Sequence, residues 1–555
     1  KQSSMVCPMF FPNLEVVGGS LGLTAAVAAI PILVFFVLVG ALRVRSHWAG
    51  LVSLMVALGL AIGVFGMPLS QAFSAAGLGI ENGLVPIVVI IVAAVWLHRL
   101  MVATGREKDL REVFAAVGNG DVRIQALLIA LCFGGLLEGL SGFGVPVAIV
   151  TALLLGLGFA PVKAATIALL ANTSPVTFAA FGVPLTTAAG VMTGPGTTHE
   201  KALEVAQYSA LLQPAIALVI PFVLALLIDR AHLRQLLPLA LVMGVVEGTG
   251  QYLTLHFISF ELGGVLPPIL TFLVVALMVR IYQPPINPEF SVPVPGKLHP
   301  GRVALAVMPY AMVIAVLMIG RMVPAVSQLL HSTDLRVTWP GWEQGAHLHK
   351  VPEGALSVGY VTIPMLSQPG FLIATAAVLS GVVFSLVGRG TPHQLGMRRV
   401  VGELGCAINR MALSSVTILE VMALSYLMNL SGMVLAIGTL LARTGVFYLL
   451  LSPLIGYMGT AVSGSSASAN ALFGGLQQSA AAQVGLPGAY AVAVNSAGGV
   501  IGKLIAPQSL AIAAAAIGDP KSEVALMRRV LGWSLGLLAF MVLVSFGLGL
   551  CYLHD

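Results

Sequence analysis

Two clusters of polar residues interrupt apolar segments of the sequence in similar ways. One segment contains Asn172-Thr173-Ser174, the other contains Asn495-Ser496, and a proline follows each asparagine twelve positions later. In lipid, a break in a helix leaves backbone N–H and C=O groups unpaired unless they line a cavity or bind a ligand. Half-helix N-termini suit a carboxylate, whereas hydroxyl and amide oxygens suit a ligand hydroxyl group, water or a small cation. The two clusters therefore predict a binding site for a small polar molecule.

Small residues break two further apolar stretches, 122–158 and 446–484, near their middles. We predict that each stretch folds as a re-entrant hairpin with these residues at its tip. Isolated glycines favour close helix packing, whereas the serine and asparagine clusters favour a ligand. The predicted substrate-binding residues are Ser141, Gly142, Phe143, Gly144, Asn172, Thr173, Ser174, Ser463, Gly464, Ser465, Ser466, Ser468, Asn470, Asn495, Ser496, Lys503 and Gln508.

Charged residues within the apolar segments are few, and each costs about 2.5–3.5 kcal/mol at bilayer depth. Lys503 could offset a substrate carboxylate, form an ion pair with a buried glutamate or extend to the cytoplasmic surface. Glu138 precedes the first hairpin tip, where it could carry a coupling proton or lock the hairpin. Glu247 and Glu420 are weaker candidates for proton coupling.

The composition indicates which elements must position these residues. The 555-residue chain is 58% hydrophobic and only 9% charged, too apolar to bury in a water-soluble core. Apolar runs of about 20 residues, without short alternating strands, predict an all-α polytopic membrane protein with a single membrane domain over residues 1–555. We predict about twelve spans, at roughly 20–42, 48–66, 83–99, 161–189, 207–228, 236–258, 265–282, 303–320, 370–388, 411–428, 488–516 and 530–552.

Lysine and arginine are clustered between the apolar runs, which is the pattern of membrane orientation. The net charge of +6 therefore does not indicate nucleic-acid binding. If neither hairpin crosses the membrane, every basic cluster is cytoplasmic, and the two termini and segment 324–368 are outside. The hairpins then enter from opposite sides, which makes 83–189 and 411–516 inverted repeats, each with a hairpin and a broken helix (161–189 and 488–516).

Other classes of site are less favoured. His331, His347 and His349 in the outer segment could bind a metal, but a solvated loop is the simpler interpretation. The four cysteines lack metal-ligand spacing, so neither a metal nor a cofactor is expected. An intramembrane enzyme would need clustered ligands or a nucleophile with its base, and no such motif falls within a span. A channel is less favoured because broken helices in inverted repeats are typical of alternating access.

Several long motifs resemble the L-lactate permease family, which includes glycolate permeases. They are Phe133-Gly134-Gly135-Leu136-Leu137-Glu138-Gly139, the stretch 142–149, Asn172-Thr173-Ser174-Pro175-Val176, the stretches 463–465 and 468–473, Gly498-Gly499-Val500, Gly502-Lys503 and the stretch 507–513. The resemblance covers nearly the whole chain. It implies import of L-lactate or glycolate, as 2-hydroxymonocarboxylates, by proton symport across the bacterial inner membrane.

The family also resembles a wider ion-transporter superfamily, whose members often move a transport domain elevator-fashion within a homodimer. Members of the family have Gly-Ser-Asp-Thr-Ser where this chain has Gly464-Ser465-Ser466-Ala467-Ser468. Because Ser466 replaces the acidic residue, proton or cation coupling through that tip is not expected. The alternatives within the superfamily are a sodium-coupled organic anion carrier and a Na⁺/H⁺ antiporter.

Overall fold

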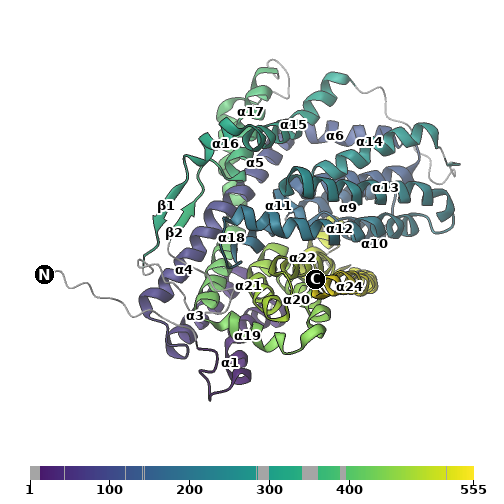
Figure 1. Ribbon diagram of the computed structural model, residues 1–555. Helices are drawn as coiled ribbons and strands as arrows, with labels where there is room; N and C mark the ends of the chain where they lie inside the picture. Colours follow the sequence, from purple (N-terminus) through teal and green to yellow (C-terminus); the bar gives the residue numbers. More distant parts are fainter. Residues whose placement is uncertain are drawn as a thin grey trace.

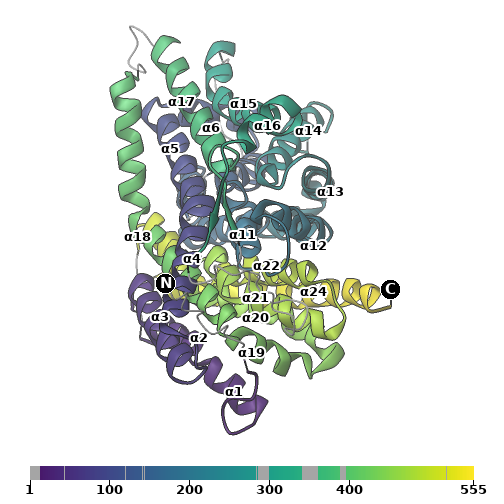
Figure 2. The ribbon, with the colours of Figure 1, turned by 60° about the vertical axis from the view of Figure 1, so that its left-hand side comes forward.

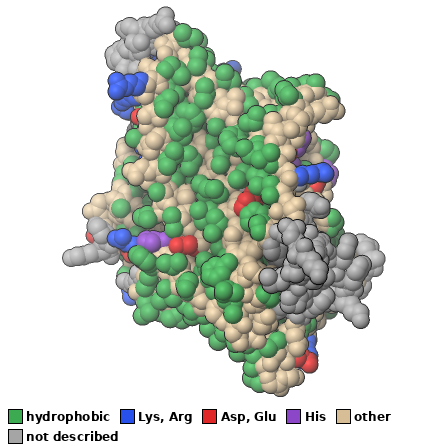
Figure 3. Space-filling model, turned by 90° about the vertical axis from the view of Figure 1, so that its left-hand side faces the viewer, with side chains coloured by type: hydrophobic (Ala, Val, Ile, Leu, Met, Phe, Trp, Pro, Cys, Tyr) green, Lys and Arg blue, Asp and Glu red, His purple; other side chains and the backbone are tan. Residues whose placement is uncertain are grey.

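The computed structural model describes residues 13–42, 44–118, 120–140, 142, 144–282, 284–285, 299–340, 360–387, 395–519 and 522–554. Helices dominate these ranges, and ten of them are long and apolar enough to cross a membrane, or up to twelve if each of two bent pairs is one span. The expected all-α polytopic fold is therefore confirmed. On the face shown in Figure 3, hydrophobic side chains are spread over the whole described surface and few charged groups lie among them.

A group of upright helices forms one side of the molecule (Figures 1 and 2), and we call it the frame. The α4 and α5 helices are joined by the π-helical turn Leu84–Val88, and both contact α18. Gly79 allows the close approach, because a Cβ there would overlap the backbone of Met422 on α18. The frame consists of α3 (Ser46–Gly63), α4 (Leu69–Gly83), α5 (Val89–Ala103), α15 (Pro300–Met322), α17 (Pro369–Val387) and α18 (Met397–Leu430).

Most of the remaining helices form a second group, the core, which packs against α18 and α5 through α21 and α11. The core carries the predicted hairpins and broken helices. It consists of α7 (Val122–Leu127), the π-helix Leu128–Phe133, α8 (Gly134–Leu140), α9 (Val145–Gly156), α10 (Pro161–Ala171), α11 (Ala179–Gly190), α12 (Thr198–Ile228), α13 (Leu233–Leu253), α14 (Leu266–Ile281), α20 (Tyr448–Ser463), α21 (Ser466–Val484), α22 (Gly488–Gly502), α23 (Pro507–Ala516) and α24 (Glu523–His554). Outside both groups lie α1 (Leu21–Ala28), α2 (Ile30–Phe36), α6 (Arg106–Val117) and α19 (Met433–Ala442).

Both predicted broken helices are bent. The first bends by 62° between Pro161–Ala171 and Val176–Gly190, and the second by 44° between Gly488–Ile505 and Pro507–Ala516. Asn172 follows the last residue of α10, as expected, but Asn495 lies inside α22. The prediction of a break at Asn495 is therefore wrong, because partners on neighbouring helices satisfy its side chain without opening the backbone.

The chain also reverses at both predicted hairpin tips, between α8 and α9 and between α20 and α21. The helical stretches Val122–Leu140 and Gly445–Ser463 are each long enough to cross a membrane on their own. The re-entrant character of the hairpins and the inverted orientation of the two repeats therefore stay predictions.

Two frame helices extend well beyond the predicted spans 83–99 and 411–428. The α4–α5 rod covers 69–103, and α18 begins at Met397. Arg99 forms an ion pair of 2.7 Å with Glu403 in the added N-terminal part of α18. Hydropathy cannot predict this part, because its charged side chains are stabilised by a helix distant in sequence.

Segment 324–368, which is predicted to lie outside the membrane, has some regular structure. It contains α16 (Pro324–His331) and two antiparallel strands, β1 (Leu335–Thr338) and β2 (Tyr360–Ile363), in which Leu335 is opposite Ile363. His331 pairs with Asp334 at 3.0 Å, whereas His347 and His349 lie outside the described residues. No group of three or more histidine, cysteine, aspartate or glutamate residues that could hold a metal occurs among the described residues.

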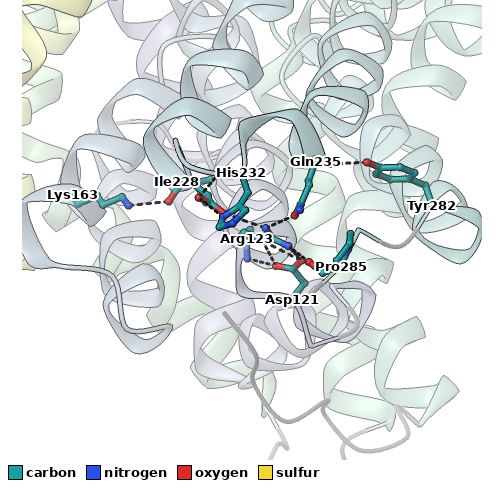
Figure 4. Close-up of polar contacts among 9 residues, drawn as sticks. Asp121, Arg123, Lys163, Ile228, His232, Gln235, Tyr282 and Pro285 are labelled. Atoms are coloured by element: carbon teal, nitrogen blue, oxygen red, sulfur yellow. Dashed lines mark hydrogen bonds and ion pairs between the residues drawn. The ribbon is translucent and has the colours of Figure 1, made fainter. Parts of the chain in front are cut away.

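A buried arginine fixes the base of the first hairpin (Figure 4). The fully buried guanidinium of Arg123 donates to the Asp121 carboxylate at 2.8 Å, to Asp229 at 3.1 Å and to the side chain of Gln235 at 3.0 Å. Burial raises the pKa of Asp229, but hydrogen bonds from His232 and Arg123 outweigh that effect and lower it overall. The cluster ties α7 to the connection between α12 and α13.

Candidate functional site

Glycines with left-handed backbone shape both hairpin tips. Gly142 has φ of 57° and Gly144 of 81° at the first tip, and Gly464 has φ of 73° at the second. Only glycine adopts these angles without steric cost. A Cβ at Gly144 would overlap Ile512, and one at Gly464 would lie 2.6 Å from Oε1 of Gln508. Both tips therefore pack closely against α23.

A cavity of about 130 Å³ lies where the tips, the bent helices and the frame meet. Pockets for drug-sized ligands measure roughly 300–1,000 Å³, so the size of this cavity favours a molecule of few heavy atoms. Nine predicted site residues line it: Gly142, Gly144, Ser463, Gly464, Ser465, Ser466, Ser468, Lys503 and Gln508. We call it the central cavity.

Three helix N-termini face the central cavity. The α9 helix begins after Gly144, α21 after Ser465 and α23 after Ala506, and each start lies at or next to a residue that lines the cavity. Ser465 caps α21 by accepting a hydrogen bond from the backbone of Ser468 at 3.2 Å. The first N–H groups of a helix have no intrahelical partner and carry partial positive charge. The cavity is therefore suited to an anion.

Lys503 adds a full positive charge at the cavity wall. Its ammonium donates to Oε1 of Glu138 at 2.7 Å. The lysine side chain is 12% exposed, whereas Glu138 is fully buried. The second carboxylate oxygen, Oε2, has no hydrogen-bond partner in the part of the chain that the structure describes. Of the three alternatives predicted for Lys503, the structure shows the ion pair with a buried glutamate. The lysine side chain also lines the central cavity.

Asn172 and Thr173 lie next to Lys503 rather than in the central cavity. Together with Lys503 and Ser509 they border a separate cavity of about 10 Å³, which is close to the smallest volume that holds one water molecule. The Asn172 side chain is buried, and its Oδ1 has no partner within the described ranges. This oxygen is free to accept a hydrogen bond from water or from a ligand.

In the second asparagine cluster, the side chains form hydrogen bonds with one another and with neighbouring protein groups. Asn495 donates to Asn470 at 2.9 Å and accepts from Gln477 at 3.1 Å. Asn470 in turn donates to the hydroxyl of Ser496 at 2.8 Å and to the carbonyl of Pro184 at 2.9 Å. None of Asn470, Asn495 and Ser496 lines the central cavity. They join α21, α22 and α11.

The other proposed acidic residues lie away from the central cavity. Glu247 on α13 is buried and accepts from Thr271 at 2.8 Å. The same helix carries Gln251, which donates to Ser174 at 3.0 Å. Glu420 lies on α18 beside Gly50, and its Oε2 has no partner among the described residues. Neither carboxylate contacts Lys503.

The backbone beside the cavity is strained. Ala180 and Phe181 have φ of 46° and 57°, and Gly182 continues the left-handed turn inside α11. Such angles cost about 1–2 kcal/mol at a residue with a side chain. Ala180 lines the cavity, so the strained backbone lies at the wall of the predicted binding site.

The central cavity also includes residues that the sequence analysis missed. Hydroxyl groups from Ser414 and Thr417 on α18 line the cavity, and no local sequence signal indicates that their face of the helix meets the tips. Nothing in the sequence around Ser46 and Phe35 indicates that they line a binding site. The remaining missed residues are Val176, Ala179, Ala180, Val183, Pro184, Ile418, Ala467, Ser509 and Ile512. Ser141 and Phe143, which were predicted to bind substrate, lie outside the described residues.

Comparison with known proteins gives consistent matches over nearly the whole length. The chain is 35% identical to the glycolate permease GlcA of Escherichia coli, over 93% of this chain and 94% of that protein. It is 34% identical to the L-lactate permease of Bacillus subtilis, over 96% of each. Among solved structures, the YdaH transporter of Alcanivorax borkumensis is similar at a TM-score of 0.48 and 15% identity, covering 90% of this chain and 98% of that one.

The sequence also matches a family model over residues 24–550, the description of which is L-lactate permease. The match extends from the first helices to α24 and includes both hairpins and both bent helices. The apolar helices and the permease relatives make the protein a multi-pass membrane protein. By these matches the chain belongs to the L-lactate permease family.

Proposed function

We propose that the protein is a secondary active transporter that imports L-lactate or glycolate, as 2-hydroxymonocarboxylates, together with a proton across the bacterial inner membrane. The observation that carries the proposal is the ion pair of Lys503 with buried Glu138 at the wall of a small cavity. Family relatives named for glycolate and L-lactate support the substrate class. The three helix N-termini and Lys503 favour its carboxylate, and the serine hydroxyls favour its 2-hydroxyl group.

The ion pair also suggests how the proton is coupled. When the substrate carboxylate engages Lys503, Glu138 loses its partner while it stays buried. An uncompensated buried charge costs several kcal/mol, so Glu138 takes up a proton instead of remaining ionised. Release of the substrate restores the pair and frees the proton. Substrate and proton therefore travel together.

Alternating access follows from the division into core and frame. The central cavity lies between the hairpin tips on the core and Ser414 and Thr417 on α18. Movement of the core along the frame, as in an elevator, would carry the site across the membrane. A homodimer would hold the frame still during this movement.

Uptake by proteoliposomes tests the proposal. Radiolabelled L-lactate and glycolate should enter faster under an inward pH gradient, and removing Na⁺ should change little. Glu138→Gln, which mimics the protonated carboxyl, should lose gradient-driven uptake but keep exchange of labelled for unlabelled substrate. Equal uptake with and without the gradient for every 2-hydroxyacid contradicts the proposal, and a requirement for Na⁺ favours the sodium-coupled alternative.

A further inference from the structure

A second and larger cavity lies between core and frame, and we propose that it is an additional binding site for the same small hydroxycarboxylates. It measures about 650 Å³, and α11 and α18 contribute to both cavities. Thr186 and Tyr426 line the larger one, whereas Pro184 and Ile418 line the central one. The predicted orientation places the larger cavity at the extracytoplasmic end, so we call it the outer cavity. The inference rests on the proposed function.

Gln368 carries the inference of a ligand there. It lies in the wall immediately before α17 and is only 3% exposed. Neither Oε1 nor Nε2 of its amide has a hydrogen-bond partner in the described part of the chain. Each unsatisfied buried group costs about 1–3 kcal/mol. A hydroxycarboxylate supplies both missing partners, since its carboxylate accepts from Nε2 and its hydroxyl donates to Oε1.

Lys201 provides the positive charge that an anionic ligand needs. It lies in the first turn of α12 and lines the outer cavity. Its ammonium donates to the carbonyl of Met192 at 2.9 Å. An ammonium has three donors, so this hydrogen bond leaves donors for a carboxylate.

The acidic residues in the wall already accept hydrogen bonds from the protein. Glu200 accepts from the backbone of Thr197 at 2.6 Å in the capping box of α12. Asp334 accepts from the hydroxyl of Ser367 at 2.6 Å. Glu81 accepts from the adjacent Asn82 at 2.9 Å. The amide of Gln368 has no partner among the described residues and the ammonium of Lys201 keeps free donors, and these two groups together fit a carboxylate with a neighbouring hydroxyl group.

Equilibrium binding of radiolabelled L-lactate to the purified full-length protein tests the second site. The wild type should bind two molecules per chain, Lys503→Met should keep only the outer one, and Gln368→Leu only the central one. In proteoliposomes, Gln368→Leu should raise the half-saturating concentration about tenfold, as a loss of about 1.4 kcal/mol does, and keep the response to the pH gradient. Lys201→Met should act in the same direction, whereas Gln483→Leu, at an exposed glutamine outside both cavities, should change nothing.

The outcomes separate this inference from the proposed function. One molecule per wild-type chain, lost in Lys503→Met and unchanged in Gln368→Leu, would mean that only water fills the outer cavity, while proton-driven uptake would leave the proposed function intact. Absence of both binding and uptake of L-lactate and glycolate by the wild type would overturn the two together. If Gln368→Leu is poorly folded, Lys201→Met decides by the same stoichiometry.

Discussion

The two asparagines expected to play equivalent parts, Asn172 and Asn495, have opposite surroundings. Asn172 follows α10 at an open break, borders a cavity with Lys503 and keeps an unpartnered Oδ1 within the described structure. Asn495 lies inside α22, and both Asn470 and Gln477 are bonded to it. The first half of the core therefore presents an unused asparagine oxygen near the site, whereas the second half uses the same residue type to hold its helices together.

The two halves of the core therefore contribute different groups to the site. The first half contributes the buried carboxylate of Glu138 and the strained turn at Ala180. The second half contributes Lys503, at the end of a helix braced by the Asn470 and Asn495 hydrogen bonds. A rigid second half fixes the ammonium, and the partner of that ammonium comes from the first half. Substitutions in the two halves test this division.

Loss of Lys503 should have the largest effect. Lys503→Met removes the charge proposed to meet the substrate carboxylate in the central cavity and leaves Glu138 without its partner, so we expect uptake to fall by at least about 100-fold, equivalent to about 2.7 kcal/mol. Lys163→Met is the matched control, because Lys163 does not line the central cavity and donates to the carbonyl of Ile228 at the end of α12 (Figure 4). Proteoliposome uptake at equal reconstituted protein measures both. Comparable uptake by the two variants would show that Lys503 does not bind the substrate.

The two asparagines should respond in different measurements. Asn172→Ala removes a group that the protein itself does not use, so its thermal stability should stay near wild type while the half-saturating substrate concentration rises about tenfold. Asn495→Ala removes the donor to Oδ1 of Asn470 and one acceptor of the Gln477 amide, so it should cost about 1–3 kcal/mol of stability, seen as a lower melting temperature in detergent. The reverse pattern, with Asn172→Ala less stable and Asn495→Ala altered only in transport, contradicts the division.

The sequence predicted the local features well. Apolar runs located most helices, and glycine, serine and proline located both tips and both bent helices, because these signals depend on neighbouring residues. It could not predict that Lys503 meets Glu138, 365 positions away, or that Asn495 is satisfied by Asn470 from another helix. It also missed Ser414 and Thr417, because nothing local shows which face of α18 meets the tips.

Substitution at the tips should have a moderate effect. Gly144→Ala and Gly464→Ala both force alanine into a left-handed conformation, at about 1–2 kcal/mol. Each new Cβ also displaces a residue that lines the central cavity, Ile512 or Gln508. Gly518→Ala is the control, since Gly518 has a similar φ of 74° but open space around its Cβ position. All three variants should lose similar stability in a thermal melt, and only the two tip variants should also lose about fivefold in uptake, or about 1 kcal/mol.

Glu247 should matter least to coupling, although the sequence makes it a candidate for carrying a proton. It lies on α13, accepts from Thr271 and contacts neither Lys503 nor the central cavity. Glutamine at this position keeps an oxygen that can accept from Thr271. We therefore expect Glu247→Gln to keep uptake within about twofold of wild type, well below the tenfold that 1.4 kcal/mol would produce, and to keep the acceleration by an inward pH gradient that Glu138→Gln loses. Loss of the gradient response in Glu247→Gln, with the response intact in Glu138→Gln, would show that Glu247 on α13, rather than Glu138, carries the coupling proton.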